Sequence, residues 1–306
     1  MLKNLMARLG HGAAKVDLVL NRNQFALGEF VEGTLVIQGG TVQQSINKID
    51  VRLMVIVRSH ESEATHLVTS IPFHQSFTIH PGERKEFPFQ YQLPNDLLLS
   101  GNYVTYFFQT ELDIAGGVDQ TDRDYIEILP PQSLQQILLA LEQLGFREKH
   151  DSRMFNGYVQ EFAFFPTSYL NGQVQELEFA ATLLPEGVRL QLELDLYSHG
   201  REQEVKREVF IYNDQLQSVS ELTSFIQEIL DEMVQHPHSA YHMEHHYGYH
   251  EHHGSGMGEA IGGFIAGAVG GMAVSELLDD DDKDDDKEEN EDDEGFLEDL
   301  FEEDDD

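Results

Sequence analysis

The chain has 306 residues, of which 40% are hydrophobic, so it is long enough to form about two domains, each with its own core. It contains no cysteine, which excludes disulfides, thiolate metal ligands and a cysteine nucleophile. The formal net charge is −37 and no basic stripe is present, which excludes non-specific nucleic-acid binding and favours basic proteins or cations as partners.

Residues 1–14 predict a short amphipathic helix, because Leu2, Leu5, Met6 and Leu9 recur at helical spacing. We expect this helix to dock on the body of the protein, and the alternative is a membrane or partner contact. These apolar residues do not form the continuous core of a signal peptide. The sequence therefore predicts a cytoplasmic protein.

Residues 15–129 change to a period of two, with apolar side chains at alternate positions. Such strands bury one face and expose the other to water. Turn signals separate the strands, including the pair Gly116 and Gly117. Many short strands without intervening helices predict an antiparallel β-sandwich. One strand shows the alternation with Ile49, Val51, Leu53, Val55 and Val57.

Residues 130–147 predict a linker followed by a helix. A Pro-Pro pair ends the preceding strand, because proline cannot donate a ladder hydrogen bond. Ser133 and Gln136 have the spacing of a capping box, and Gly145 can end the helix. The apolar face of this helix contains Leu134, Ile137, Leu138, Leu141 and Leu144.

Residues 148–213 return to a period of two and predict a second β-sandwich. Residues 214–235 then predict a second amphipathic helix, capped by Ser218 together with Glu221. The clearest strand of the second sandwich has Val188, Leu190, Leu192, Leu194 and Leu196 on one side.

Residues 236–275 begin with a histidine-rich block and continue into a glycine-rich run. Eight of the 15 histidines lie between His236 and His253. A solvated linker, a labile metal site and a pH-responsive contact are the three interpretations of this block. The metal interpretation uses zinc or nickel, since His238, His242, His246 and His250 recur every four residues and imidazole nitrogens bind these ions. No other cofactor is expected.

The glycine-rich run contains Gly263, Gly267 and Gly271 at four-residue intervals, which on a helix would permit close backbone approach. The apolar stretch 261–274 is shorter than the roughly 20 residues that a bilayer crossing needs. We therefore expect self-association and no transmembrane span, with weak membrane contact as the alternative.

Residues 276–306 hold 21 acids and two lysines and predict a disordered acidic tail. Phe296, Leu297, Leu300 and Phe301 interrupt the acids at helical spacing. One hypothesis is that they fold into a basic-rimmed hydrophobic groove on a partner or on the body of this chain. The alternative is an incidental apolar spot in a solvating tail.

Catalytic motifs are absent from the sequence: it has no GxSxG elbow, no P-loop, no GxGxxG after a strand and no HExxH. One acidic segment could gather oxygen ligands for calcium at a hairpin, although a solvated β-turn has the same composition. Its acids are Glu111, Asp113, Asp119, Asp122 and Asp124.

Several segments, in order, resemble a known family. They are "GAAKVDLVL…GEFVEGTLVIQGG", "DRDYIEILPP", "LLALEQLGFRE" and "QEFAFFPT" followed by "VQELEF". Together they are similar to the bacterial sporulation-control proteins over about residues 12–212. That resemblance implies arrestin-like β-sandwiches, a cytoplasmic adaptor or regulator, and no catalytic residues. The histidine block and the acidic tail are not part of the pattern.

The predicted fold is therefore mainly β, with two arrestin-like antiparallel β-sandwich domains, connecting helices and a disordered C-terminal tail. The predicted function is a non-enzymatic regulator or scaffold of the sporulation-control type, which acts through contacts with protein partners. The alternative is a metal-handling protein whose histidine-rich segment is the working part.

Overall fold

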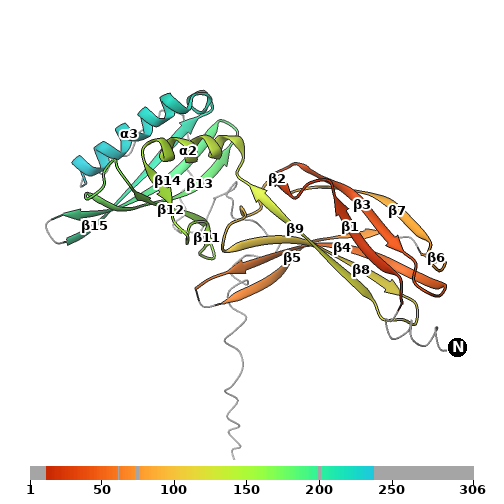
Figure 1. Cartoon of the computed structure of the whole chain (residues 1–306). Coiled ribbons are helices and arrows are strands. Elements are labelled where there is room, and N and C mark those ends of the chain that lie inside the picture. The colour runs from red at the N-terminus through yellow and green to blue at the C-terminus, as the bar shows by residue number, and fades with distance from the viewer. Residues whose placement is uncertain (1–11, 61, 74–75, 199–200, 238–306) are drawn as a thin grey trace, which may run out of the picture.

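The computed structural model describes residues 12–60, 62–73, 76–198 and 201–237. The predicted N-terminal helix and all of the predicted segments beyond residue 237 lie outside these ranges. The described residues form a first unit, strands β1 to β9, and a second unit, which runs from helix α2 to helix α3 (Figure 1).

The first unit consists of two sheets packed face to face. A three-stranded sheet has the order β1-β3-β7, and a six-stranded sheet has the order β2-β9-β8-β4-β5 with β6 also paired to β4. All of these pairs are antiparallel except β2 with β9. The strands are β1 Lys15–Leu20, β2 Gln24–Ala26, β3 Phe30–Gln38, β4 Gln44–Arg58, β5 Glu63–Phe73, β6 Phe77–Ile79, β7 Arg84–Gln92, β8 Val104–Ile114 and β9 Gln120–Leu129.

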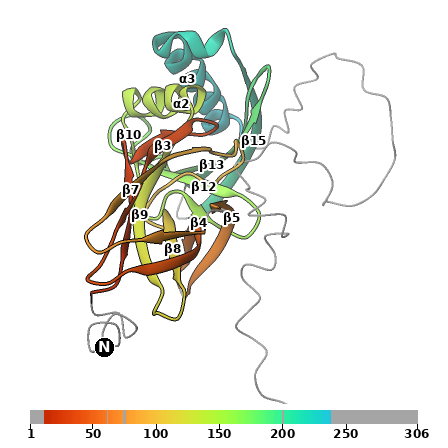
Figure 2. The ribbon, with the colours of Figure 1, turned by 90° about the vertical axis from the view of Figure 1, so that its right-hand side faces the viewer.

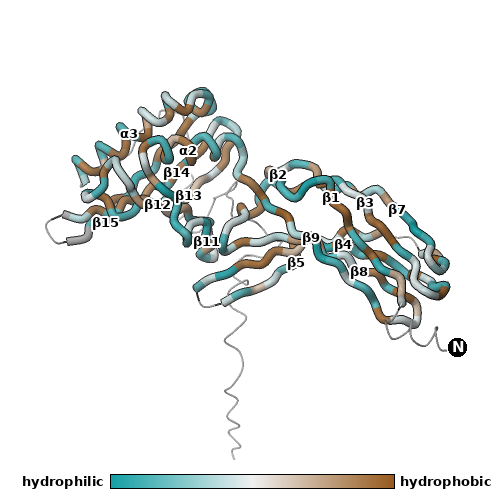
Figure 3. Tube along the Cα trace, viewed as in Figure 1, coloured by the Kyte–Doolittle hydropathy of each residue, from teal (hydrophilic) through white to brown (hydrophobic). Residues whose placement is uncertain are grey.

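The buried faces follow the alternation in the sequence. In β4, Ile49, Val51, Leu53, Val55 and Val57 are all buried and face the other sheet, as predicted. Figure 3 shows hydrophobic and hydrophilic stretches alternating along the strands of this unit. The core therefore lies between the two sheets.

The second unit has one six-stranded sheet, with the order β10-β12-β13-β14-β15 and β11 paired to β12. Helices α2 and α3 contact each other on one side of this sheet (Figures 1 and 2). The elements are α2 Gln132–Gln143, β10 Phe146–Glu148, β11 Met154–Phe155, β12 Gln160–Pro166, β13 Val174–Leu184, β14 Gly187–Ser198, β15 Arg201–Tyr212, the 3₁₀ turn Gln215–Gln217 and α3 Val219–Gln235.

The mainly β class with several sheets is confirmed, but the second layer of the second unit differs from the prediction. A second sheet was expected over residues 148–213, and the structure has two helices in its place. The physical reason is that both helices have an apolar face wide enough to cover a sheet. Those faces bury Leu134, Ile137, Ala140 and Leu141 of α2 and Leu222, Ile226, Ile229, Leu230 and Met233 of α3.

The two helix starts differ. The Ser218 hydroxyl accepts a hydrogen bond from the Glu221 N–H, so the predicted cap of α3 is confirmed. The predicted cap at Ser133 is wrong, because α2 begins at Gln132 with Pro131 as its N-cap and without a side-chain cap. The fixed φ of proline suits this position, so the helix starts before the serine.

A buried glutamine joins the two units. Gln160 is 2% exposed. Its side-chain oxygen accepts from the Leu99 N–H at 2.8 Å, and its amide nitrogen donates to the carbonyls of Leu99 at 2.8 Å and Arg153 at 2.9 Å. The Arg153 guanidinium in turn donates to the Ser100 carbonyl at 3.1 Å. Buried polar groups are thus satisfied across the boundary, which holds the units together.

Candidate functional site

Most of the residues predicted from the sequence to form sites lie outside the described ranges. This applies to His238, His242, His246 and His250, to Gly263, Gly267 and Gly271, and to Phe296, Leu297, Leu300 and Phe301. Within the described ranges, no helix is both long enough and apolar enough to cross a membrane.

The five acids considered for calcium do not form one group. The Glu111 carboxylate pairs with Arg52 at 2.9 Å, and the Asp113 carboxylate accepts from the Asn47 amide at 2.8 Å. Asp119 accepts from a backbone N–H inside its own turn. Only Asp122 and Asp124 come together, because residues two apart on a strand share one face.

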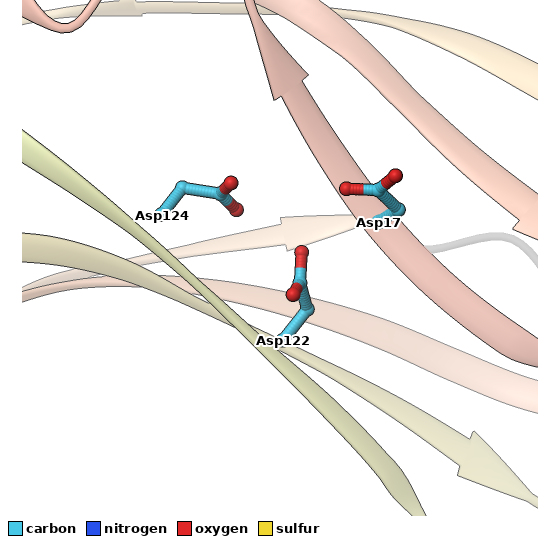
Figure 4. Close-up of side chains that lie close together, drawn as sticks. All are labelled: Asp17, Asp122 and Asp124. Carbon is cyan, nitrogen blue, oxygen red and sulfur yellow. The ribbon is translucent and has the colours of Figure 1, made fainter.

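Asp122 and Asp124 of β9 meet Asp17 of β1, and the three carboxylates have oxygens within 4.8 Å of one another. Figure 4 shows Asp17 reaching from its own strand toward the other two side chains. We call these three residues the inter-sheet cluster, since β1 and β9 belong to different sheets. The Leu18 N–H donates to Asp122 Oδ2 at 3.1 Å.

Burial, and then the nearby charges of Asp122 and Asp17, together raise the pKa of Asp124 to about 7. One Asp124 oxygen is fully enclosed, without a hydrogen-bond partner. A proton shared with Asp122 would remove one of the two negative charges of the pair, as in other paired carboxyl groups. With one ligand oxygen each, the three carboxylates supply only three of the six to eight oxygens that calcium prefers. The geometry therefore fits a proton-holding pair better than a calcium site.

The second unit carries acids on the side of its sheet that faces away from the helices. We call this the acidic face, and it consists of Glu161, Glu176, Glu178, Glu193, Asp195 and Glu204. In the strand register, Glu178 lies opposite Glu193, Glu176 lies opposite Asp195, and Asp195 lies opposite Glu204. Like charges directly opposite each other destabilise a sheet.

Lysines compensate part of this charge. Lys206 Nζ lies 2.9 Å from a Glu193 oxygen and 2.6 Å from a Glu204 oxygen. Lys149 Nζ pairs with Glu176 at the other side of the face. Glu178 lies between them, and its pKa is raised to about 7 by burial and then by the charges of the surrounding acids. The acidic face therefore keeps an excess of negative charge.

An open cavity of about 470 Å³ adjoins the acidic face. It is lined by Phe165, Pro166, Asn171, Gly172, Val174, Gln175 and Tyr197. Both of its aromatic side chains are exposed, with exposed fractions of 42% for Phe165 and 53% for Tyr197. Tyr197 lies two residues beyond Asp195 on β14, so both side chains point to the same side of the sheet.

One wall of the cavity comes from the turn between β12 and β13. Leu170 has φ 58° and Gly172 has φ 88°, and left-handed backbone is unusual for leucine. The Leu170 carbonyl accepts from both the Gln173 and Val174 N–H groups, while its side chain packs against the core. These contacts hold the turn in a strained shape, which is a frequent feature of binding sites.

Sequence reasoning named Asp122 and Asp124 but not Asp17 of the inter-sheet cluster, and it did not find the acidic face or the cavity. The alternation of acids along β13 and β14 was a usable signal, because it places Glu176 and Glu178 on one face and Glu193 and Asp195 on one face. The pairing that brings these acids opposite one another depends on register, which the sequence alone leaves open.

Three comparisons place the chain among known proteins. The family model described as SpoOM protein matches residues 2–198. A sporulation-control protein, spo0M of Bacillus subtilis (strain 168), is 34% identical over 257 residues, which cover 76% of this chain and 98% of that protein. A crystal structure of Spo0M from Bacillus subtilis matches with a TM-score of 0.57 and 32% identity, covering 72% of this chain and 99% of the other.

Proposed function

Because this chain belongs to the Spo0M family of sporulation-control proteins, we propose that it is a non-enzymatic cytoplasmic regulator that works through contacts with other proteins. Family membership supports a role in sporulation control. The contact mechanism and the cytoplasmic location are the further steps of the proposal.

One observation carries the contact mechanism: the second unit covers only one side of its sheet with helices. The other side combines the acidic face with the exposed rings of Phe165 and Tyr197. Exposed aromatic side chains beside polar groups are enriched where proteins bind one another. We therefore place the main contact surface on this side of the sheet.

Strand addition is a second mode of contact. Among the described strands, β15 pairs only with β14 and β5 pairs only with β4, so each leaves an edge without a strand neighbour. An extended segment of a partner can add to such an edge through main-chain hydrogen bonds. Charged residues along β15, such as Lys206 and Glu208, would limit indiscriminate pairing.

Crosslinking in living cells tests the proposal. The full-length protein should yield reproducible crosslinks to at least one other protein, and deletion of the gene should alter the timing or frequency of sporulation in a spore-forming host. Crosslinks should map to the exposed side of the second-unit sheet or to the edges of β5 or β15. Absence of any reproducible partner under these conditions contradicts the contact mechanism.

The acidic tail provides a separate test. We propose that Phe296, Leu297, Leu300 and Phe301 anchor the tail in a hydrophobic groove with a basic rim. Replacing Phe296, Leu300 and Phe301 with Ala keeps every charge and removes only the large apolar groups. A partner that depends on these anchors should bind the triple variant more weakly, whereas equal binding would show that charge alone is responsible.

Metal handling by the histidine-rich block is the alternative function. Calorimetry with zinc or nickel should show binding to the full-length chain and none after deletion of residues 236–253. The affinity should fall below about pH 6.5, because protonated imidazole cannot bind a metal. Undiminished binding after the deletion would place the ligands elsewhere.

A further inference from the structure

The cavity and the acidic face together form one continuous surface. Tyr197 at the cavity lies on the same side of β14 as Asp195 and Glu193, at successive alternate positions. We infer that this surface binds an extended basic segment of a partner protein, with one aromatic or large aliphatic side chain in the cavity and lysines or arginines over the acids. This inference rests on the proposed contact function and names the chemistry of the partner.

The residues that line the cavity indicate which side chain of the partner it binds. Phe165, Pro166, Val174 and Tyr197 give it mainly apolar walls, and Asn171 and Gln175 add amide groups. Its volume of about 470 Å³ is more than enough for one large side chain, and the site is open on one side. Burial of such a side chain is the usual source of affinity at a small contact.

The acids of the acidic face favour basic residues in the rest of the partner's segment. Glu176, Asp195 and Glu204 occupy one row across three neighbouring strands, and the next row contains Glu178 and Glu193. Lys149 pairs with Glu176, and Lys206 pairs with Glu193 and Glu204, so two lysines stand against the six acids of this face and its net charge stays negative. Cationic side chains of a partner would relieve repulsion that the free protein must tolerate.

Strand geometry fixes the spacing of the partner's residues. Alternate residues on a strand are about 7 Å apart, both on β14 and on an extended ligand. An anchor beside Tyr197 would therefore bring the residue two positions away over Asp195 and the residue four positions away over Glu193. The expected pattern is one large apolar residue with basic residues two and four positions from it.

A symmetric peptide makes the test independent of binding direction. The probe is KSKSFSKSK, and its control is KSKSSSKSK, which has the same charge without the anchor. The acidic tail of the full-length chain attracts both peptides through the charge that they share, and the tail is identical in the unmodified and variant proteins. The readout is therefore the ratio of the two dissociation constants, measured by fluorescence polarisation on the full-length protein.

We expect the phenylalanine peptide to bind the full-length protein roughly tenfold or more tightly than its control, because one large apolar side chain becomes buried. Tyr197→Ala should bring this ratio close to one. Tyr125→Ala is the matched control, since Tyr125 is 54% exposed on the first unit and Tyr197 is 53% exposed. It should leave the ratio unchanged.

The double variant Glu193→Gln and Asp195→Asn preserves side-chain size and should weaken both peptides and flatten their salt dependence. Circular dichroism and thermal unfolding will show whether each variant keeps its fold. A ratio near one for the unmodified protein, or a ratio that survives Tyr197→Ala, overturns the inference. Self-association that is lost in Tyr197→Ala would assign the surface to a second copy instead and would equally overturn it.

These outcomes are separable from failure of the proposed function. If the peptides fail while cellular crosslinks map to the edges of β5 or β15, the contact mechanism stands and only this surface is wrongly assigned. If the cellular crosslinks also fail, both conclusions are wrong.

Discussion

The two units treat clustered carboxylates in opposite ways. In the first unit, Asp17 of one sheet meets Asp122 and Asp124 of the other, where burial and the neighbouring carboxylates raise the pKa of Asp124 to about 7 and a proton can remove part of the negative charge. In the second unit, the acidic face is open and has Lys149 and Lys206 as neighbours. The neighbours therefore decide the means of compensation: a shared proton suits two carboxyl groups that lie side by side, whereas lysines offset part of the charge of the acidic face and leave the rest available to a partner.

The hydrogen bonds of Gln160 link the two units, so a substitution at Gln160 should have the largest effect. Gln160→Leu replaces the amide with an apolar side chain of similar size and leaves the Leu99 N–H and carbonyl without their partner. We expect a loss of about 2 to 4 kcal/mol in the free energy of unfolding, because buried groups lose hydrogen bonds. Urea unfolding measures this change.

Gln191→Leu on the exposed side of β14 is the control for that experiment. It should change the free energy of unfolding by no more than about 0.5 kcal/mol, as is usual for surface substitutions. Equal effects of the two substitutions would show that the Gln160 hydrogen bonds do not hold the units together.

Asp124→Asn tests the inter-sheet cluster. The pKa of Asp124 in the folded state, about 7, is above the ordinary value of 3.8, so the folded protein holds the extra proton between these values and loses stability as pH rises through them. The asparagine cannot ionise, and we expect it to add about 1 to 2 kcal/mol at pH 8, after allowance for partial exposure. At pH 5 the gain should be much smaller.

Thermal unfolding at both pH values measures the effect of Asp124→Asn. Glu127→Gln removes a carboxylate from the exposed side of the same strand and is the matched control. If both substitutions change the thermal stability by the same amount at each pH, proton binding by the inter-sheet cluster does not affect the stability of the protein.

Glu178→Gln applies the same test to the acidic face of the second unit. The pKa of Glu178 is also raised to about 7, so the substitution should stabilise the protein at pH 8, by about 0.5 to 1 kcal/mol because of its exposure. Salt near 1 M, with a screening length of about 3 Å, should remove more of this gain than of the gain from Asp124→Asn, because more neighbouring carboxylates contribute to the raised pKa of Glu178. Equal salt sensitivity would remove the distinction between the clusters.

Within the described residues the helical layer belongs to the second unit, and its two helix starts give the smallest expected effects. Ser218→Ala removes the side-chain cap of α3 and should cost about 0.5 kcal/mol, at the low end for caps because the bond to the Glu221 N–H measures 3.4 Å. Ser133→Ala should have no measurable effect, since α2 has no side-chain cap. A larger loss for Ser133→Ala than for Ser218→Ala, in urea unfolding, would contradict this assignment.

The sequence by itself determined where strands and helices form. Alternation predicted the buried side chains from Val188 to Leu196, and all five of those apolar residues are buried. The serine and glutamate spacing at Ser218 correctly predicted a helix start. These features depend on residues close together in the chain, so local periodicity and capping chemistry suffice to specify them.

Tertiary structure decided what lies against each buried face. Alternation shows that one side of β14 is covered, but a sheet or a helix can cover it equally well, and in this protein the helices do. Asp17 meets Asp122 from more than a hundred residues away, and Gln160 reaches Leu99 across two units. Such contacts arise from sheet register and layer packing, which no local pattern encodes.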